Sequence, residues 1–258
     1  MKLLNKIYMI AGIFLVYKNP LMPILDCLGL LGRGIITVRL RNGLEFRVRT
    51  QTSDLRNLNE IFIHRIYNKS LKQVNRFADP VIINIGAHIG GFSIIAGKEI
   101  KNSRIYSFEP LKENYDLLNE NIKLNKMSNI KTYNLAVSNR RGELDLFFQE
   151  GDTGGAGISD IFPTKWFIEG RLKQTKVNCI TLADVFEENK IDECDLLKID
   201  AEGSEYKILY TAPFEKIKNI VLEYHANIDV SSLKAFLESC GFDVKIKPRS
   251  RLLYAKKL

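Results

Sequence analysis

The chain has few cysteines and no long apolar run. The first argues against a disulfide-rich or zinc-binding protein, and the second against a membrane-spanning helix. Its 258 residues include four cysteines, which are widely spaced and form no C-x-x-C pair: Cys27, Cys179, Cys194 and Cys240. This spacing indicates neither a zinc site nor a disulfide framework. It is typical of a protein in a reducing compartment. We therefore expect a cytoplasmic protein that binds no metal ion.

An apolar run of eleven residues, IYMIAGIFLVY at positions 7–17, is too short to cross a bilayer, which takes about 20 residues. Lys2 and Lys6 precede it, but no small-residue cleavage site of a signal peptide follows. We expect a helix that docks on the protein or lies at a membrane interface, and docking is favoured.

The net charge of +8 is concentrated at the two ends of the chain. Residues 1–50 carry a net charge of +6, residues 244–258 carry +6, and the middle is left with −4. A uniformly basic protein would suggest nucleic acid, which this distribution disfavours. The basic ends can instead make peripheral contact with an anionic membrane or meet an anionic substrate.

The central motif is VIINIGAHIGGF at residues 81–92, in which a β-branched apolar run ends in a glycine-rich turn. The pattern predicts a buried strand, a turn and a helix. Its spacing, G-x-x-x-G-G, is neither the dinucleotide fingerprint nor a P-loop, so a pyrophosphate ligand is disfavoured. Such glycines bring bare backbone close to a ligand, or serve packing alone.

A second predicted strand, residues 104–108, ends at Glu109, 25 positions after Asn84. An acid at that place can accept hydrogen bonds from the hydroxyls of a ribose. Alternatively, it is a carboxylate at a helix start before Pro110. Together, the turn and the acid indicate a nucleoside ligand.

Three carboxylates, Asp200, Glu202 and Glu205, follow another apolar strand in the stretch DLLKIDAEG. Clustered acids are costly unless they face a ligand, a metal or water. Acids at a helix N-terminus are the alternative explanation. His225 follows a later strand at residues 219–224, and it is either catalytic or a buried structural histidine.

Strands and helices alternate along the rest of the chain, which predicts a mostly parallel sheet with an antiparallel edge. Ala136, after the third strand, either lines a purine pocket or packs in the core. The remaining predicted elements are a hairpin (35–40 and 44–49), a helix starting at Ser53, a helix (111–124), strands (130–135 and 142–148), a glycine-rich loop or lid (151–157), an edge strand (176–180), helices (181–189 and 231–240) and a closing hairpin (242–246 and 251–256).

Four motifs, in their sequences and in their order along the chain, resemble those of the FkbM family of S-adenosylmethionine-dependent methyltransferases. They are NIGAHIGGFS, SFEPLKENYDLLNENIKLN, NLAVSNRRGELDL and LLKIDAEGSEYKIL, and they fall between about residues 50 and 225. The resemblance implies a Rossmann-like, seven-stranded methyltransferase sheet with an antiparallel C-terminal hairpin. This α/β domain would span residues 51–258, after an N-terminal extension of residues 1–50 with a helix and a β-hairpin.

The resemblance also assigns cofactor-binding residues. It implies that Gly86, Ala87 and Gly90 approach the methionine part of S-adenosylmethionine, that Glu109 holds the ribose hydroxyls and that Ala136 borders the adenine.

Two further cofactor positions depart from the family pattern. Asn84 stands where the family usually has Asp, and His88 where it usually has Asn. An amide replaces a carboxylate that could pair with the cofactor's ammonium group, and it can still form hydrogen bonds.

The resemblance places Asp200 and Glu202 near the sulfonium and the acceptor. A carboxylate or an imidazole could remove the acceptor's proton, and we expect Glu202 or His225 to do so. The sequence DAEG stands where many nitrogen methyltransferases have a Pro-Pro loop. We therefore expect methylation of a hydroxyl of a sugar, glycan or other small molecule. The alternatives are an RNA methyltransferase, suggested by the basic ends, and a non-catalytic binding module, suggested by Asn84.

Overall fold

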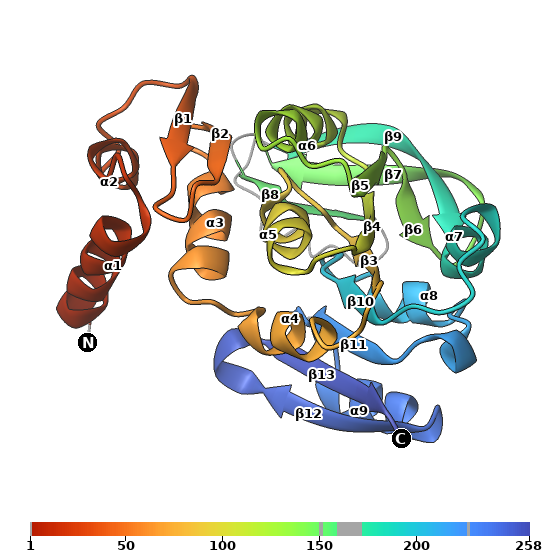
Figure 1. The fold of residues 1–258 in the computed structure, drawn as a ribbon. Coiled ribbons are helices and arrows are strands. Elements are labelled where there is room, and N and C mark those ends of the chain that lie inside the picture. The colour runs from red at the N-terminus through yellow and green to blue at the C-terminus, as the bar shows by residue number, and fades with distance from the viewer. Residues whose placement is uncertain (1, 150–151, 159–171, 226–227) are drawn as a thin grey trace.

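The computed structural model describes residues 2–149, 152–158, 172–225 and 228–258 (Figure 1). Its centre is a seven-stranded sheet in the order β12-β13-β11-β10-β3-β4-β5, in which β13 is antiparallel to its neighbours. The fold is therefore the Rossmann-like methyltransferase sheet with an antiparallel C-terminal hairpin, as the sequence predicts. The strands are β3 (Val81–Ile85), β4 (Arg104–Phe108), β5 (Ile130–Tyr133), β10 (Leu196–Ile199), β11 (Asn219–Glu223), β12 (Phe242–Lys247) and β13 (Leu252–Lys257).

Helices cover both faces of this sheet, and residues of its central strands alternate between two apolar clusters. Ile82 of β3 belongs to one cluster, together with side chains of α5 and α6, whereas Ile83 belongs to the other, together with side chains of α7 and α9. This alternation is the period of two that a strand imposes. The helices are α3 (Asp54–Phe62), α4 (Asn68–Val74), α5 (Gly91–Glu99), α6 (Lys112–Leu124), α7 (Leu182–Glu188), α8 (Glu205–Leu209) and α9 (Val230–Ser239), with short 3-10 turns at Phe214–Lys216 and Pro248–Ser250.

A second, four-stranded sheet in the order β6-β9-β7-β8 corrects three predictions. The predicted third strand ends early, because β5 stops at Tyr133 and Ala136 begins β6 in the other sheet. The predicted edge strand (176–180) belongs to β9, which lies between β6 and β7. Residues 152–157 of the predicted lid loop form strand β8. The strands are β6 (Ala136–Ser138), β7 (Gly142–Gln149), β8 (Asp152–Ile158) and β9 (Leu172–Thr181).

Gly154 of β8 has a packing reason. A Cβ at Gly154 would lie 2.7 Å from Nδ2 of Asn57 and 2.9 Å from Oγ of Ser53. The Gly154 N–H donates to that Ser53 hydroxyl at 2.8 Å. Strand β8 therefore closes against the start of α3, which a larger side chain would prevent.

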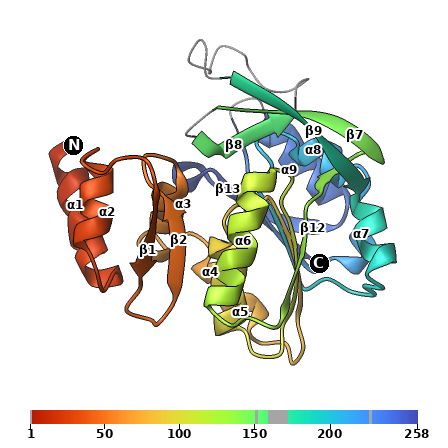
Figure 2. The same cartoon turned by 90° about the horizontal axis from the view of Figure 1, so that it is seen from above.

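The N-terminal segment consists of α1 (Lys2–Val16), α2 (Leu21–Cys27), β1 (Ile35–Arg39) and β2 (Glu45–Arg49). The two helices lie farthest from the main sheet, and the hairpin lies between them and α6 (Figures 1 and 2). Ile13 and Tyr17 are buried, and the Tyr17 hydroxyl donates to Oδ1 of Asn59 at 2.8 Å. The docking prediction is thus confirmed for this side of α1. Among the described helices, none combines the length and the apolar character that a membrane span requires.

Side chains of α6 complete the free edge of the N-terminal hairpin. Oδ1 of Asn121 accepts the Arg47 N–H at 2.7 Å, and its Nδ2 donates to the carbonyls of Arg47 (3.1 Å) and Ile89 (2.9 Å). One turn later, Asn125 makes the same pair of bonds to Glu45. Two asparagines thus act as a substitute strand for β2. The domain boundary at residue 50 stays a prediction.

A buried ion pair joins the hairpin to α3. Asp54 is fully buried, and its Oδ2 accepts the backbone N–H and the Nε–H of Arg49, each at 2.9 Å. Its Oδ1 lies 2.8 Å from Nη2 of Arg49 and 3.2 Å from Nε2 of His88. Burial alone would raise the pKa of Asp54, but the bonds from His88 and Arg49 hold it well below its usual range.

We predict that Asn121→Ala lowers the free energy of unfolding by about 2–3 kcal/mol, because it leaves backbone groups of β2 buried without partners. Urea denaturation followed by circular dichroism measures this loss. Lys123→Ala, an exposed change on the same helix, is the control and should stay within about 0.5 kcal/mol of the wild type. Equal stability of Asn121→Ala and the wild type would contradict the account of β2.

We predict that Asp54→Asn costs about 3 kcal/mol at neutral pH, because it leaves Arg49 buried without its charge partner. The folded-state pKa is depressed, so this contribution is complete above the unfolded-state pKa of about 3.9 and disappears as the pH falls toward the folded-state value. The stability gap between wild type and variant should therefore be constant above about pH 5 and narrow below about pH 4.

The measurement is urea denaturation across this pH range. Asp243→Asn removes an exposed carboxylate paired with Lys245 and is the matched control, with little effect at any pH. A gap that widens in acid would refute the assigned sign.

Candidate cofactor and acceptor site

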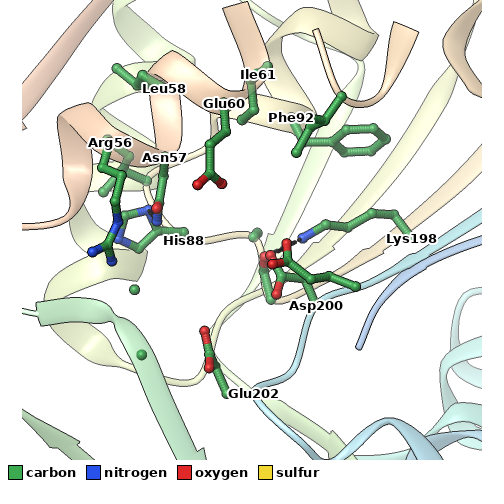
Figure 3. A pocket seen from close by; sticks show the side chains of 18 of the residues that line it. Arg56, Asn57, Leu58, Glu60, Ile61, His88, Phe92, Lys198, Asp200 and Glu202 are labelled. Carbon is green, nitrogen blue, oxygen red and sulfur yellow. Dashed lines mark hydrogen bonds and ion pairs between the residues drawn. The ribbon is translucent and has the colours of Figure 1, made fainter. Parts of the chain in front are cut away.

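Two adjoining cavities lie at the carboxyl ends of the parallel strands. The larger, of about 420 Å³, lies between α3 and the ends of β3, β10 and β11, and the smaller, of about 70 Å³, extends toward the ends of β4 and β6. Glu60, Asp200 and Glu202 point into one open space (Figure 3). The two cavities share the lining residues Asn57, Gly86, His88, Gly154, Asp200 and Glu202.

The turn after β3 lies against the end of β10, so that no side chain fits between Gly86 and the backbone of Asp200. Gly86 has a φ of +76°, and a Cβ there would lie 1.8 Å from the carbonyl oxygen of Asp200. Only glycine fits at this position. The N–H groups of Gly86 and Ala87 both donate to the carbonyl of Phe108 at 3.0 Å, so the turn is tied to β4 as well. Gly86, Ala87 and His88 all line the larger cavity.

Gly90 and Asn84 lie behind this turn, and the structure does not place them at either cavity. A Cβ at Gly90 would meet Cδ1 of Leu118 at 2.7 Å, so this glycine serves the packing of α6. Asn84 is fully buried and donates to Ser93 at 2.8 Å, whose hydroxyl lies 2.8 Å from that of Ser107. Contact of Asn84 and Gly90 with the cofactor therefore stays a prediction.

The position of Asn84 also explains why an amide suits it. Its Nδ2 donates to a hydroxyl, that of Ser93, while its Oδ1 is buried without a hydrogen-bond partner among the described residues. A carboxylate would be costly there because its charge would be buried without a partner.

Glu109 is buried beside the turn and lines the smaller cavity together with Ala136. It accepts the backbone N–H groups of His88 (2.8 Å) and Leu111 (3.0 Å) and the side-chain amide of Asn114 (3.3 Å). Burial nevertheless raises its pKa. Since a carboxylate has about four acceptor positions, Oε2 keeps room for one more donor from the cavity.

The structure brings Asp200, Glu202 and His225 together, although they come from two strand ends. Nε2 of His225 lies 3.3 Å from Oε2 of Glu202 and 3.9 Å from Oδ1 of Asp200. On its other side, Nδ1 of His225 lies 3.0 Å from Oε1 of the buried Glu205. All three predicted catalytic residues therefore line the larger cavity as one cluster.

Charge within this cluster decides which member can accept a proton. Burial would lower the pKa of His225, but Glu202 and Glu205 raise it to about 11. These carboxylates thus favour the imidazolium form of His225, which has no free lone pair for a substrate proton. Burial raises the pKa of Glu202; it would also raise that of Asp200, but Lys198 and His225 lower it. The carboxylates remain the better proton acceptors.

Sequence reasoning missed Lys198, whose Nζ donates to the carbonyl of Gly86 at 2.9 Å and to Oδ2 of Asp200 at 3.3 Å. A lysine in the middle of a buried strand was an available signal, since lysine is rarely buried without a partner. It also missed Glu223, whose pKa is raised to about 8 by burial and by the charge of Asp200. Asn57 and Glu60 of α3 also line the cavity, and no pattern in the sequence indicated this.

Comparison with known proteins agrees with this geometry. The family profile described as "Methyltransferase FkbM domain" matches residues 84–244. The chain is 27% identical to "Methyltransferase sdnD" of Sordaria araneosa over 212 residues, which cover 72% of this chain and 80% of that protein. It is 25% identical to "31-O-demethyl-FK506 methyltransferase FkbM" of Streptomyces tacrolimicus, again over 212 residues, 72% of this chain and 80% of that protein.

Among solved structures, the chain is similar to the precorrin-6y C5,15-methyltransferase of Geobacter metallireducens, with a TM-score of 0.46 and 16% identity over 75% of this chain and 88% of that one. The family profile covers more than half of the present chain. The protein therefore belongs to the FkbM family of methyltransferases, whose cofactor is S-adenosylmethionine.

Proposed function

We propose that this methyltransferase methylates a hydroxyl oxygen of a small molecule, a sugar or a glycan. The observation that carries the proposal is a cavity of about 420 Å³, sized for a small acceptor, with Asp200 and Glu202 on its wall. The name of the Streptomyces relative describes a small-molecule acceptor whose oxygen is methylated. Because β10 leads into Asp-Ala-Glu-Gly and not into a Pro-Pro loop, a nitrogen acceptor is disfavoured.

The residues at the smaller cavity fit the adenosyl part of the cofactor. Glu109 retains an acceptor position for a ribose hydroxyl, and Phe108 and Ala136 offer apolar walls for an adenine ring. Gly86 and His88 line both cavities and would border the methionine part. S-adenosylmethionine supplies the electrophilic methyl carbon. The chain's own residues must orient the acceptor oxygen toward it, which is a large part of catalysis in such a displacement.

The acceptor hydroxyl must lose a proton as its oxygen forms the new bond. We assign this uptake to a carboxylate of the Asp200 and Glu202 pair, because both ring nitrogens of His225 already face carboxylates, Glu205 at Nδ1 and Glu202 at Nε2, and these contacts raise its pKa. Lys198, bonded to Gly86 and Asp200, holds the wall of the acceptor cavity against the turn. Of the two bases that the sequence suggests, Glu202 and His225, we favour Glu202.

We further propose that α1 attaches the enzyme peripherally to an anionic membrane surface at its cytoplasmic face. Within residues 8–16 of α1, where side-chain exposure is described, the exposed residues are apolar and include Tyr8, Ile10, Phe14 and Leu15. A helical segment with apolar residues on its exposed side as well as its buried side needs a second apolar environment. Nearby, the exposed residues Leu21, Leu28 and Leu30 extend the same type of surface.

Charge favours a membrane over a second copy of the chain as the partner of this surface. Arg41 donates from Nε to the carbonyl of Phe14 at 3.2 Å, which places a cation beside the apolar side of α1. Lys18 and Arg33 are also exposed, whereas Asp26 is buried. Two such surfaces would repel each other, but anionic headgroups would attract both the cations and the apolar side chains.

We predict that Glu109→Gln weakens binding of S-adenosylhomocysteine roughly 10- to 100-fold, because a charged acceptor for the ribose is lost. Isothermal titration calorimetry measures the effect. Glu113→Gln, a change at an exposed position of α6, is the matched control and should bind like the wild type.

In the same preparations, an acceptor panel of paired alcohols and amines tests the reaction. We expect methyl transfer to alcohols; transfer to amines or to RNA alone would overturn the proposed acceptor class. Unchanged affinity in Glu109→Gln would instead overturn the cofactor assignment.

We predict that the wild type sediments with vesicles containing phosphatidylglycerol and that Phe14→Asp reduces this binding about tenfold, because it charges the apolar side of α1. Tyr210→Asp is the control, since Tyr210 is at least as exposed as Phe14, 71% against 51%, but belongs to another surface. Equal vesicle binding by Phe14→Asp and the wild type would sink this proposal. So would a dimer that forms without lipid and that Phe14→Asp breaks.

A further inference from the structure

Asp200, Glu202 and His225 offer three ligand atoms, one each, that lie within 4.8 Å of one another. Two carboxylate oxygens and one imidazole nitrogen are a common donor set for a divalent metal ion. We propose that this cluster binds a divalent cation of the Mg²⁺ or Mn²⁺ type on the wall of the acceptor cavity. The inference rests on the proposed function and deepens it, and it replaces the expectation that the protein binds no metal.

The distances suit a common metal ion. Ligands at about 2.1 Å from an octahedral ion are roughly 3.0 Å apart when adjacent and roughly 4.2 Å apart when opposite. Nε2 of His225 lies 3.3 Å from Glu202 and 3.9 Å from Asp200, between these limits. Small side-chain rotations would bring all three atoms onto one ion.

The orientation of His225 is an independent observation that points to a ligand on Nε2. Its Nδ1 lies 3.0 Å from Oε1 of Glu205, which also accepts the Gly203 N–H at 3.1 Å and is fully buried. Metal-binding histidines commonly have their second nitrogen held by a carboxylate in this way. The arrangement fixes the ring so that Nε2 faces the two carboxylates that line the cavity.

The surroundings carry more negative than positive charge. Glu60 lines the same cavity as Asp200 and Glu202, and Glu205 lies behind His225, whereas Glu223 pairs with Arg251 of the cavity wall. Lys198 approaches from the sheet and bonds to Oδ2 of Asp200, whereas Oδ1 is the oxygen nearer to His225. A cation at Nε2 would therefore meet the side of Asp200 that Lys198 does not occupy.

Such an ion has a chemical use in the proposed reaction. Three protein ligands leave further coordination positions open toward the cavity, and an acceptor hydroxyl can take one of them. Coordination lowers the pKa of that hydroxyl, so its proton passes more readily to a carboxylate oxygen or to water while its oxygen attacks the methyl carbon. The ion displaces the proton on Nε2 of His225 when it binds, and no oxidant or reductant is involved.

The test uses the full chain, freed of metal with EDTA and dialysed, and Mn²⁺ as the probe. Electron paramagnetic resonance of free Mn²⁺ counts bound ions. We expect one site per chain in the wild type and at least tenfold weaker binding in His225→Ala and in the nearly isosteric Glu202→Gln. Glu143→Gln removes an exposed carboxylate elsewhere and should bind Mn²⁺ like the wild type.

Calorimetry with S-adenosylhomocysteine on the same samples shows whether each variant is folded and separates the two proposals. Absence of Mn²⁺ binding at millimolar concentration, or equal binding by Glu202→Gln and the wild type, overturns the metal site. In that case a proton on His225 compensates the negative charge of the surrounding carboxylates. Methyl transfer that persists in EDTA also overturns the role of the metal while the proposed function stands. Mn²⁺ binding with methylation only of amines leaves the metal site and overturns the acceptor class.

Discussion

The site depends on one close contact, the approach of Gly86 to the backbone carbonyl of Asp200. Strands β3 and β10 are neighbours in the sheet, and their ends converge so far that no Cβ fits between them. Lys198 spans the same junction, because its ammonium binds both the carbonyl of Gly86 and the carboxylate of Asp200. The turn that borders the cofactor side and the acids of the acceptor side are therefore parts of one rigid unit.

This unit concentrates negative charge on a half-buried wall of the larger cavity. The carboxylates of Asp200, Glu202 and Glu205 surround a single imidazole, and their charges cost free energy unless a cation is close. From inside the sheet, the ammonium of Lys198 compensates the charge of Asp200. A proton or a metal ion on Nε2 of His225 compensates the charges of Glu202 and Glu205. An apolar cavity wall would destabilise the folded protein less than this cluster of charges does. The cluster therefore indicates a role in ligand binding.

The sequence indicated the site through residues at strand ends, because parallel strands bring their carboxyl ends to one edge of a sheet. That rule placed Gly86, Glu109, Asp200 and His225 correctly near one another. The rule could not tell which residues of the motif line a cavity and which pack in the interior. Gly90 and Asn84 belong to the same motif as Gly86, but they face α6 and α5. The rule also could not predict the charge of His225. That charge depends on the contact with Glu205, which follows a different strand of the sheet.

The second sheet was hardest to foresee for a related reason. Four glycines within residues 151–157 predict a loop, since glycine has no side chain to stabilise a strand. The pairing of β8 with β7 and its fit against Ser53 and Asn57 arise from tertiary contacts. A segment that looks unstructured in the sequence is thus an ordered part of the wall of both cavities, through Gly154.

Helix α3 shows that the N-terminal segment helps to build the site. Asn57 and Glu60 of this helix face the cavity, yet the contacts that hold α3 come from both sides of residue 50. Tyr17 binds Asn59, Arg49 forms its buried ion pair with Asp54, and Asp54 in turn reaches His88 in the turn after β3. A boundary at residue 50 cuts between Arg49 and Asp54, the two halves of that pair. The extension therefore fixes the position of one wall of the cavity in which we place the acceptor.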